Sequence, residues 1–206
     1  EWAYWKPVYA PDDAMTRHDA VAAVREALVR AGELRLRSDQ PLGFLMSGGV
    51  DSNGLIGIAR RVFELEVHGY TITADDPRYD ERDAVAASAD ELGVRSTRIP
   101  LSTAGFLEGL RTLVAQHDAP VYTITAYASW QIMRAMARDG FRVAISGVGA
   151  DEILSGYYHH HLGYLAEVRD DPARFASAQA SWAKWVQPIV RNPFLRDPGP
   201  YLRDPG

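Results

Sequence analysis

The sequence predicts an α/β fold: a parallel twisted sheet with helices on both faces, followed by a helical region. Two observations carry this prediction. Short apolar or β-branched runs alternate with longer segments whose apolar residues recur at helical spacing, the pattern of a parallel sheet with crossover helices. Glycine-rich turns directly follow two of these runs, Leu42–Met46 and Arg142–Ser146. Open parallel sheets bind ligands at such turns, outside the carboxyl ends of the strands.

The elements are expected in the following order. Residues 1–15 are aromatic, contain proline and lack periodicity, so they predict a linker or leading segment before a domain spanning 16–206. Helices are expected at 16–38, 55–63, 80–92, 105–116 and 126–138, and strands at 42–46, 67–73, 95–101 and 142–146. Gly93 is expected to end the third helix. Beyond Tyr157 the spacing stays helical to about Val186, and a proline-rich irregular segment follows.

The composition is that of a globular domain. The 206 residues are 47% hydrophobic and 24% charged, so a core can form without a disulfide or a metal. The absence of cysteine excludes a disulfide framework, a cysteine-based zinc site and a cysteine nucleophile within these residues, and it fits a reducing cytoplasm. The net charge of −5 comes from acidic and basic residues mixed along the chain. We therefore expect a cytoplasmic protein that binds neither nucleic acid nor a membrane.

The first glycine-rich turn predicts a pyrophosphate-binding loop. Its members are Ser47, Gly48, Gly49, Val50, Asp51 and Ser52. Because the glycine pair carries no side chains, successive backbone N–H groups can converge on one anion, and the following helix adds partial positive charge. The carboxylate of Asp51 repels phosphate unless it binds a Mg²⁺ ion that bridges phosphate oxygens. Asp51 is therefore a predicted magnesium ligand.

A plainer interpretation of this turn is a tight connection in which Asp51 and Ser52 are helix N-caps. The length of the motif, placed between a strand and a helix, favours phosphate binding instead. No Gly-Lys-Ser/Thr ending is present, so the turn is not a P-loop, and its glycine spacing differs from that of a dinucleotide fingerprint.

The second glycine-rich turn presents two adjacent acids. Its members are Ser146, Gly147, Val148, Gly149, Ala150, Asp151 and Glu152. A carboxylate placed near the first turn would complete a magnesium site, so Asp151 is the second predicted metal ligand. The alternative is a capped turn whose acids are favoured by the positive end of a helix.

Together the two turns resemble the synthetase domain of glutamine-hydrolysing asparagine synthetases, which are N-type ATP pyrophosphatases. The resemblance runs from about Leu42 to Tyr157, extends loosely over the whole chain, and includes Tyr79-Asp80-Glu81 and Ala119-Pro120. The first turn alone is shared with NAD and GMP synthetases and tRNA-thiolating enzymes. The second turn, with its continuation to Tyr157, is typical of the asparagine synthetase branch.

The resemblance implies an adenine nucleotide alpha hydrolase-like, Rossmann-like fold and a ligase that uses ATP and Mg²⁺. It implies that a carboxylate, by default that of aspartate, is adenylated with release of pyrophosphate, after which ammonia from glutamine displaces AMP. By position, the ATP and pyrophosphate contacts would be Leu45, Ser47, Gly48, Gly49, Val50, Asp51, Ser52, Thr73, Ser146 and Gly147. The substrate side would be Val148, Gly149, Glu152 and Tyr157. The catalytic metal ligands would be Asp51 and Asp151.

One departure from the family pattern bears on the substrate. Val148 stands where the family usually has a glutamate near the acyl substrate. This leaves open a tailoring amidotransferase or a β-lactam-synthetase-like enzyme that acts on another carboxylate. A further alternative is a non-catalytic nucleotide-binding module. The resemblance also implies a glutaminase domain upstream and a synthetase domain that is incomplete at Gly206, and a homodimer is compatible with it.

Neither the run of three histidines nor the pair of tryptophans is expected to form a ligand site. His159, His160 and His161 are consecutive, so on a helix their rings point in different directions and form a poor chelate. Trp182 and Trp185 lie at helical spacing and are expected to anchor a core or an interface.

Overall fold

The computed structural model describes residues 2–6, 8, 10–12, 14–76 and 79–203. They fall into two compact units, one that ends at Ser146 and one that begins at Gly147. The first unit contains the sheet, and the second is helical. The described residues before Thr16 contain neither helix nor strand.

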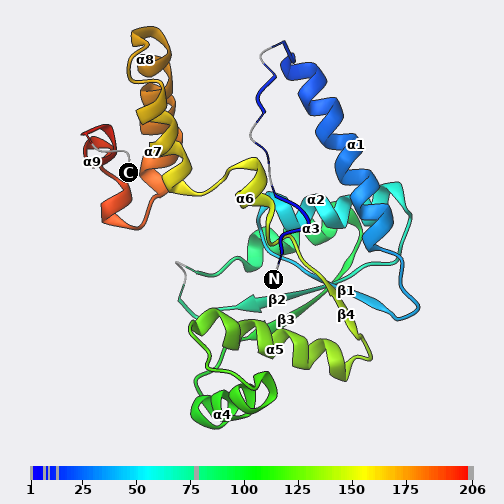
Figure 1. The fold of residues 1–206 in the computed structure, drawn as a ribbon. Coiled ribbons are helices and arrows are strands. Elements are labelled where there is room, and N and C mark those ends of the chain that lie inside the picture. The colour runs from blue at the N-terminus through cyan, green and yellow to red at the C-terminus, as the bar shows by residue number, and fades with distance from the viewer. Residues whose placement is uncertain (1, 7, 9, 13, 77–78, 204–206) are drawn as a thin grey trace. The chain divides into compact units, whose positions relative to one another are not determined.

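The first unit is built on a sheet of four parallel strands in the order β3-β2-β1-β4 (Figure 1). The strands are β1 (Leu42–Leu45), β2 (His68–Thr73), β3 (Arg95–Pro100) and β4 (Val143–Ile145). All four lie where the sequence predicts them. Phe44 in β1 pairs with residues of both β2 and β4, so β1 is an inner strand. This position explains why β1 is a continuous apolar run rather than an alternating one.

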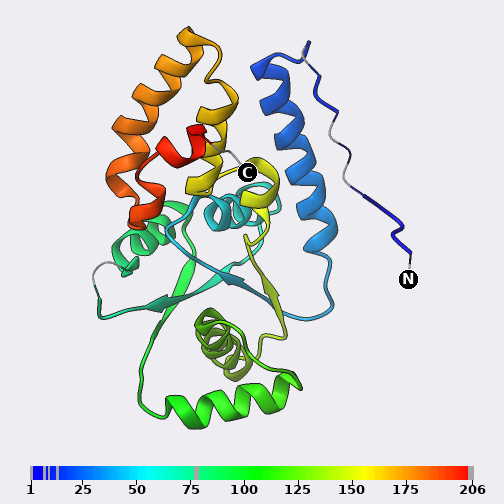
Figure 2. The ribbon, with the colours of Figure 1, turned by 60° about the vertical axis from the view of Figure 1, so that its left-hand side comes forward.

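Helices cover both faces of this sheet, as the sequence predicts (Figures 1 and 2). One face carries α2 (Val50–Gly57) and α3 (Arg82–Leu92), and the other carries α5 (Ile124–Arg138). The core on the first face consists of Phe44, Met46, Ile56, Ala59, Val67, Val85 and Ala89. The core on the second face consists of Tyr70, Ile132, Ala135 and Met136. Removal of this apolar surface from water holds the layers together.

The other helices of the first unit are α1 (Arg17–Arg35) and α4 (Phe106–His117). Gly93 ends α3 in the left-handed conformation, with φ of 61°, as predicted. The prediction that the second helix begins at Leu55 is wrong, because α2 begins at Val50, directly after the glycine pair. Asp and Ser are unfavourable inside a helix but acceptable in its first turn, which is where α2 has them. A π-helical turn, Ile58–Val62, continues α2.

A buried polar contact joins β2 to the end of α5. Tyr70 is fully buried, and its hydroxyl donates a 2.7 Å hydrogen bond to Oδ2 of Asp139. Burial and this bond raise the pKa of Tyr70 above its ordinary value. The His68 ring stacks on Tyr70, with ring centroids 4.6 Å apart, and its Nε2 lies 2.7 Å from Oγ1 of Thr97. Burial, with a smaller contribution from the charge of Arg95, lowers the pKa of His68.

The second unit is helical, as expected for the residues beyond Tyr157. Its helices are α6 (Ala150–Leu154), α7 (Tyr158–Glu167), α8 (Pro172–Ser181) with a π-helical turn (Trp182–Val186), and α9 (Gly199–Arg203). Asp171 caps α8 and Pro172 is its first residue, so the helical region is interrupted there.

The core of this unit is centred on Leu162, Leu165 and Trp182. Trp182 is therefore a core residue, as predicted. Trp185 is 65% exposed, and the ammonium of Lys184 lies 4.4 Å from its ring centroid. The expectation of an irregular ending is wrong in part. Besides α9, that segment contains two short 3₁₀ turns, Gln187–Ile189 and Pro193–Leu195, each with proline near its start.

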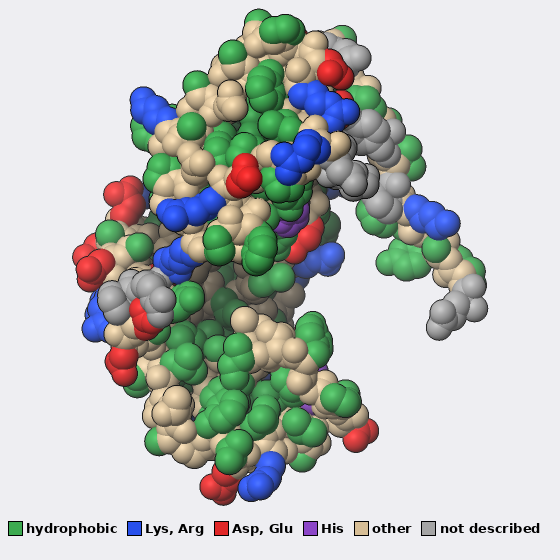
Figure 3. All heavy atoms as spheres, turned by 90° about the vertical axis from the view of Figure 1, so that its left-hand side faces the viewer, with side chains coloured by type: hydrophobic (Ala, Val, Ile, Leu, Met, Phe, Trp, Pro, Cys, Tyr) green, Lys and Arg blue, Asp and Glu red, His purple; other side chains and the backbone are tan. Residues whose placement is uncertain are grey.

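The surface carries charges of both signs. On the face drawn in Figure 3, Lys and Arg side chains are interspersed with those of Asp and Glu, in keeping with the mixed charge of the sequence. In the part of the chain that the structure describes, none of the helices is both long enough and apolar enough to cross a bilayer.

Candidate functional site

The first glycine-rich turn connects β1 directly to α2. Gly49 is the N-cap residue of α2 and has an extended backbone, so Val50, Asp51 and Ser52 form the first helical turn. The interpretation of Asp51 and Ser52 as N-caps is therefore wrong. Because Gly49 has no side chain to cap the helix, the first N–H groups of α2 remain available to an external acceptor. A helix N-terminus of this kind favours an anion.

The hydroxyl of Ser52 holds the turn in shape. Its Oγ accepts the N–H of Ser47 at 3.2 Å and lies 2.9 Å from Oγ of Ser47. The same oxygen lies 3.3 Å from the carbonyl oxygen of Ser47 and 3.2 Å from that of Gly49. Ser52 is 7% exposed, so most of this network is shielded from water. Ser52, which is predicted to contact ATP or pyrophosphate, thus also has an internal structural role.

The backbone N–H groups that precede α2 already have partners. The N–H of Ser47 donates to Ser52, that of Gly49 donates to Oγ of Ser47 at 3.2 Å, and that of Gly48 donates to Oε2 of Glu81 at 3.0 Å. The sequence predicts that the glycine N–H groups converge on phosphate. In the structure, the first-turn N–H groups of α2 are the ones without an intrahelical partner.

The contact between Gly48 and Glu81 comes from the packing of α3 against the turn. A Cβ built on Gly48 would lie 2.8 Å from Cβ of Ala84, so only glycine allows this approach. Glu81 belongs to the stretch Tyr79-Asp80-Glu81 that resembles the family, but nothing in the sequence predicts a role for its side chain. A partner 33 positions away carries no local signal, and the contact depends on the fold.

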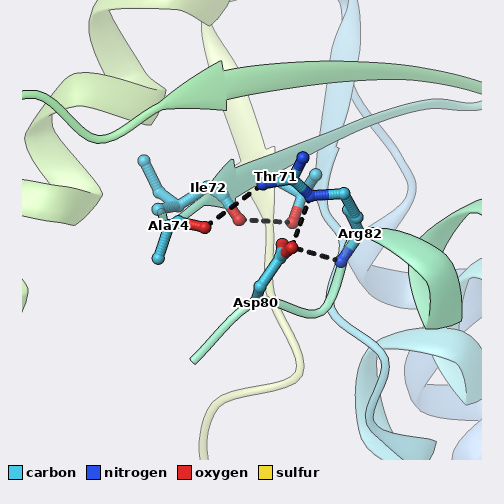
Figure 4. Close-up of polar contacts among 5 residues, drawn as sticks. All are labelled: Thr71, Ile72, Ala74, Asp80 and Arg82. Carbon is cyan, nitrogen blue, oxygen red and sulfur yellow. Dashed lines mark hydrogen bonds and ion pairs between the residues drawn. The ribbon is translucent and has the colours of Figure 1, made fainter. Parts of the chain in front are cut away.

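The segment after β2 is tied to the start of α3 (Figure 4). The guanidinium of Arg82 forms an ion pair with Asp80 and donates to the carbonyl oxygen of Ala74 at 3.3 Å. Oδ1 of Asp80 also accepts the backbone N–H of Arg82 at 3.2 Å. These contacts join the chain just beyond the end of β2 to the first turn of α3, next to Glu81.

Three of the residues predicted near the nucleotide lie at neighbouring strand ends. Leu45 ends β1, Thr73 ends β2, and Ser146 follows β4. Because β1 lies between β2 and β4, the carboxyl ends of these strands form one edge of the sheet. The first turn leaves from the same edge, where open parallel sheets bind ligands.

The second glycine-rich turn leads into the short helix α6. Gly149 is its N-cap residue and has φ of 105°, a conformation that favours glycine. Asp151 and Glu152 lie in the first turn, as the capped-turn alternative expects, and this position is equally compatible with metal binding. The Asp151 carboxylate lies against Gly156, because a Cβ on Gly156 would overlap Oδ1 of Asp151. No pattern in the sequence predicts this contact.

The residues predicted on the substrate side differ in their surroundings. The Tyr157 hydroxyl donates a 2.6 Å hydrogen bond to Oε1 of Glu152, and this bond is the main reason why the pKa of Glu152 is lowered. The ring of His159 stacks on that of Tyr157, with centroids 5.4 Å apart. Val148 is 89% exposed. Glu152 and Tyr157 are thus brought together, while Val148 presents an apolar side chain to solvent.

The two predicted metal ligands belong to different units, Asp51 to the first and Asp151 to the second. A magnesium site that they share therefore stays a prediction. Among the residues that the structure describes, the side chain of Asp51 forms neither a hydrogen bond nor an ion pair, so its carboxylate is available for an ion. No group of three His, Asp or Glu side chains suited to a metal occurs in that part of the chain. Carboxylates supplemented by phosphate oxygens and water suit Mg²⁺, which needs few protein ligands.

A buried side-chain oxygen next to the first turn was also missed by sequence reasoning. Oδ1 of Asn53 in α2 has no hydrogen-bond partner among the described residues. A buried acceptor in this state costs on the order of 1–3 kcal/mol, so an unsatisfied one beside a candidate ligand site is notable.

Comparison with known proteins identifies relatives. The profile of the family described as asparagine synthase matches residues 23–195. Asparagine synthetase [glutamine-hydrolyzing] 1 of Bacillus subtilis is 27% identical over 155 residues, which cover 75% of this chain and 23% of that protein. Amidase chyE of Penicillium rubens is 24% identical over 182 residues, which cover 80% of this chain and 27% of that protein. The chain thus spans about a quarter of the length of these relatives.

Among solved structures, NH3-dependent NAD synthetase from Campylobacter jejuni aligns with 92% of this chain and 94% of that chain. Its TM-score is 0.42 and its sequence identity is 11%.

Proposed function

The chain belongs to the asparagine synthase family, and from that membership we propose that it is the ATP-using part of an amide-forming ligase. In this reaction a carboxylate is activated with ATP and then converted into an amide by ammonia, which glutamine supplies.

The observation that carries the proposal is the N-terminus of α2. Gly49 leaves the first N–H groups of that helix without a cap, and the carboxylate of Asp51 stands in the same turn without a partner among the described residues. An anion-binding helix end beside a free carboxylate is suited to a phosphate group that carries a divalent cation. A simple structural turn needs neither feature.

We assign Asp51 and Asp151 as the residues that hold Mg²⁺. The ion would neutralise negative charge on the phosphate oxygens and so favour loss of pyrophosphate. The first-turn N–H groups of α2 would bind the pyrophosphate end of ATP, and the hydroxyl of Ser47 would lie beside it. Leu45 and Thr73, at the ends of β1 and β2, would contact the adenosine.

The chemistry requires little covalent participation by the protein. A carboxylate oxygen of the substrate attacks the α-phosphorus of ATP, and the bond from that phosphorus to the bridging oxygen breaks, releasing pyrophosphate. Ammonia then attacks the acyl carbon, AMP leaves with the electron pair of the acyl–oxygen bond, and a proton is lost from nitrogen to give the amide. Positioning and charge stabilisation supply most of the rate enhancement in such transfers.

Aspartate is the default acceptor that we propose, with asparagine as product. A specific observation favours a second candidate. Val148 replaces a glutamate that the family usually has near the acyl substrate, and its exposed apolar side chain cannot bind an ammonium group. One relative bears the name amidase rather than asparagine synthetase. A tailoring amidotransferase or β-lactam-synthetase-like enzyme acting on another carboxylate is therefore the alternative.

Two measurements test the proposal. The first is binding of ATP in the presence of Mg²⁺, with Asp51→Asn as the variant and Asp90→Asn, an exposed residue in the last turn of α3, as the matched control. We expect the Asp51 variant to weaken binding by about ten-fold or more and the control to have no effect. A folded chain that does not bind ATP, or an Asp51 variant that binds as the wild type does, contradicts the proposed site.

The second measurement is release of pyrophosphate when ATP and Mg²⁺ are offered with aspartate or with other carboxylates. Release only with aspartate supports asparagine as product, whereas release with another carboxylate supports the tailoring alternative. Binding of ATP without release with any carboxylate indicates a non-catalytic nucleotide-binding module. A glutaminase partner domain, a homodimer and a cytoplasmic location stay predictions.

A further inference from the structure

An acidic side chain accepts a hydrogen bond from a backbone N–H group of the first glycine-rich turn, where phosphate is expected to bind. Oε2 of Glu81 accepts the backbone N–H of Gly48 at 3.0 Å. Hydrogen bonds to ionised acceptors are about twice as strong as those between neutral groups. Of the three N–H groups that precede α2, only that of Gly48 donates to an acid, since the other two donate to serine hydroxyls. An anion of the chain itself thus lies where a phosphate oxygen is expected.

The position of Glu81 leaves its carboxylate free to move. Glu81 is the N-cap residue of α3, but its side chain does not cap that helix. Its neighbour Arg82 is engaged by Asp80 and by the carbonyl oxygen of Ala74 (Figure 4), so this guanidinium is directed to other acceptors. The contact with Gly48 is exposed to solvent. The positive end of the α3 dipole favours the Glu81 carboxylate both when it is bonded to Gly48 and when it is not. When it leaves Gly48, the carboxylate can therefore be hydrated by solvent instead of being buried without a partner.

A phosphate and the Glu81 carboxylate compete at this donor. One N–H group makes one strong hydrogen bond, and two anions at the same donor repel each other. We propose that Glu81 is an internal competitor of the nucleotide: it binds the Gly48 N–H in the free protein and is exchanged for a phosphate oxygen when ATP binds. This inference rests on the proposed function of the loop.

The same exchange has a consequence for turnover. After the carboxylate of the substrate has been adenylated, pyrophosphate has to leave the loop. Return of Glu81 to Gly48 removes one hydrogen bond from pyrophosphate and places a like charge beside it, so product leaves faster. Glu81 is in this sense a positioning residue, because it acts through the loop and not on the reacting atoms.

Titration of the chain with inorganic pyrophosphate in the presence of Mg²⁺ tests the exchange. Glu81→Gln retains an oxygen acceptor but removes the charge, and Glu81→Ala removes both. Asp83→Asn removes the same charge from an exposed residue two positions away, in the first turn of α3, and is the control. We expect both Glu81 variants to bind pyrophosphate about three- to ten-fold more tightly, and the control to change binding less than two-fold.

A steady-state measurement separates competition from a structural role. Competition predicts that Glu81→Gln lowers KM for ATP and also lowers kcat, because product is held longer. A residue that only shapes the loop predicts the opposite change in KM. Unchanged or weaker pyrophosphate binding in Glu81→Gln, while wild type binds ATP and Asp51→Asn does not, overturns the competition and leaves the proposed function intact. If neither wild type nor Glu81→Gln binds pyrophosphate, both the competition by Glu81 and the proposed function of the turn are wrong.

Discussion

The carboxylate of Asp151 lies against the backbone of Gly156, so closely that a Cβ on Gly156 would occupy the position of Oδ1. Asp151 lies in the first turn of α6, and Gly156 directly follows Ser155, the C-cap residue of that helix. Any side chain at position 156 has to displace the carboxylate, which is the end of a flexible side chain. The identity of residue 156 therefore controls the direction of a predicted metal ligand without contacting the metal.

The variant Gly156→Ala is expected to reorient Asp151, because the added Cβ displaces its carboxylate. The Mg²⁺ concentration needed for half-maximal pyrophosphate release should rise by about ten-fold, since a ligand displaced by about an ångström loses its coordination. The variant's free energy of unfolding is expected to change by less than about 1 kcal/mol, since the group that moves is a side-chain end. Pyrophosphate release measured against Mg²⁺ concentration checks this. Gly163→Ala in α7, where a Cβ meets no atom within 4 Å, is the control and should leave magnesium dependence unchanged.

Removal of the Ser52 hydroxyl should loosen the first turn. Ser52→Ala leaves the N–H of Ser47 without its acceptor, so we expect the free energy of unfolding to fall by about 1–2 kcal/mol and ATP binding to weaken. Urea denaturation gives the first quantity and calorimetric titration the second. Ser38→Ala, which removes an exposed acceptor for Gln40, should cost less than about 0.5 kcal/mol. Equal stability of the two variants would argue against a structural role for Ser52.

Protonation of His68 should destabilise the first unit. Its pKa in the folded protein is lowered from an ordinary value of 6.5 by burial and by Arg95, while Asp139 acts in the opposite direction. The unfolded chain therefore binds a proton before the folded chain does. The stability contributed by the neutral ring is present above about pH 6.5 and is lost as pH falls through the lowered folded value.

Urea denaturation at pH 7.5, 6.5 and 5.5 measures this loss. In His68→Gln the fall in stability over this range should be smaller than in the wild type. His18→Gln, at an exposed position of α1, should retain the wild-type slope. A His68 variant with an unaltered slope would assign the pH dependence to other groups.

Much of the first unit could be predicted from sequence because its signals are local. The apolar run of β1 and Gly93 after α3 each express a single physical requirement, burial on both faces in one case and a positive φ in the other. The start of α2 was misplaced because Val50, Asp51 and Ser52 have weak helix propensity, which matters little in a first turn. The interruption at Asp171-Pro172 did have a local signal, a capping acid followed by proline, that periodicity alone does not reveal.

The candidate site was predictable only in part, since several of its contacts join distant residues. The position of the first turn follows from the strand before it and the glycine pair within it. The contact of Gly48 with Glu81 depends on how α3 packs, and that of Asp151 with Gly156 on how the chain turns after α6. Neither contact has a sequence pattern of its own. The hydrogen bonds that Ser52 makes within the first turn likewise have no sequence pattern of their own.

The hydroxyl network of Ser52 implies that the first turn is preorganised. Its bonds to Ser47 and Gly49 lie within a stretch of six residues, so the backbone holds the shape of the turn before any ligand arrives. A ligand that binds here does not have to order a mobile loop, and the entropy lost on association is correspondingly small. We therefore expect hydrogen-exchange protection of the Ser47 and Gly49 amides in the ligand-free protein, with little increase at these two positions on binding.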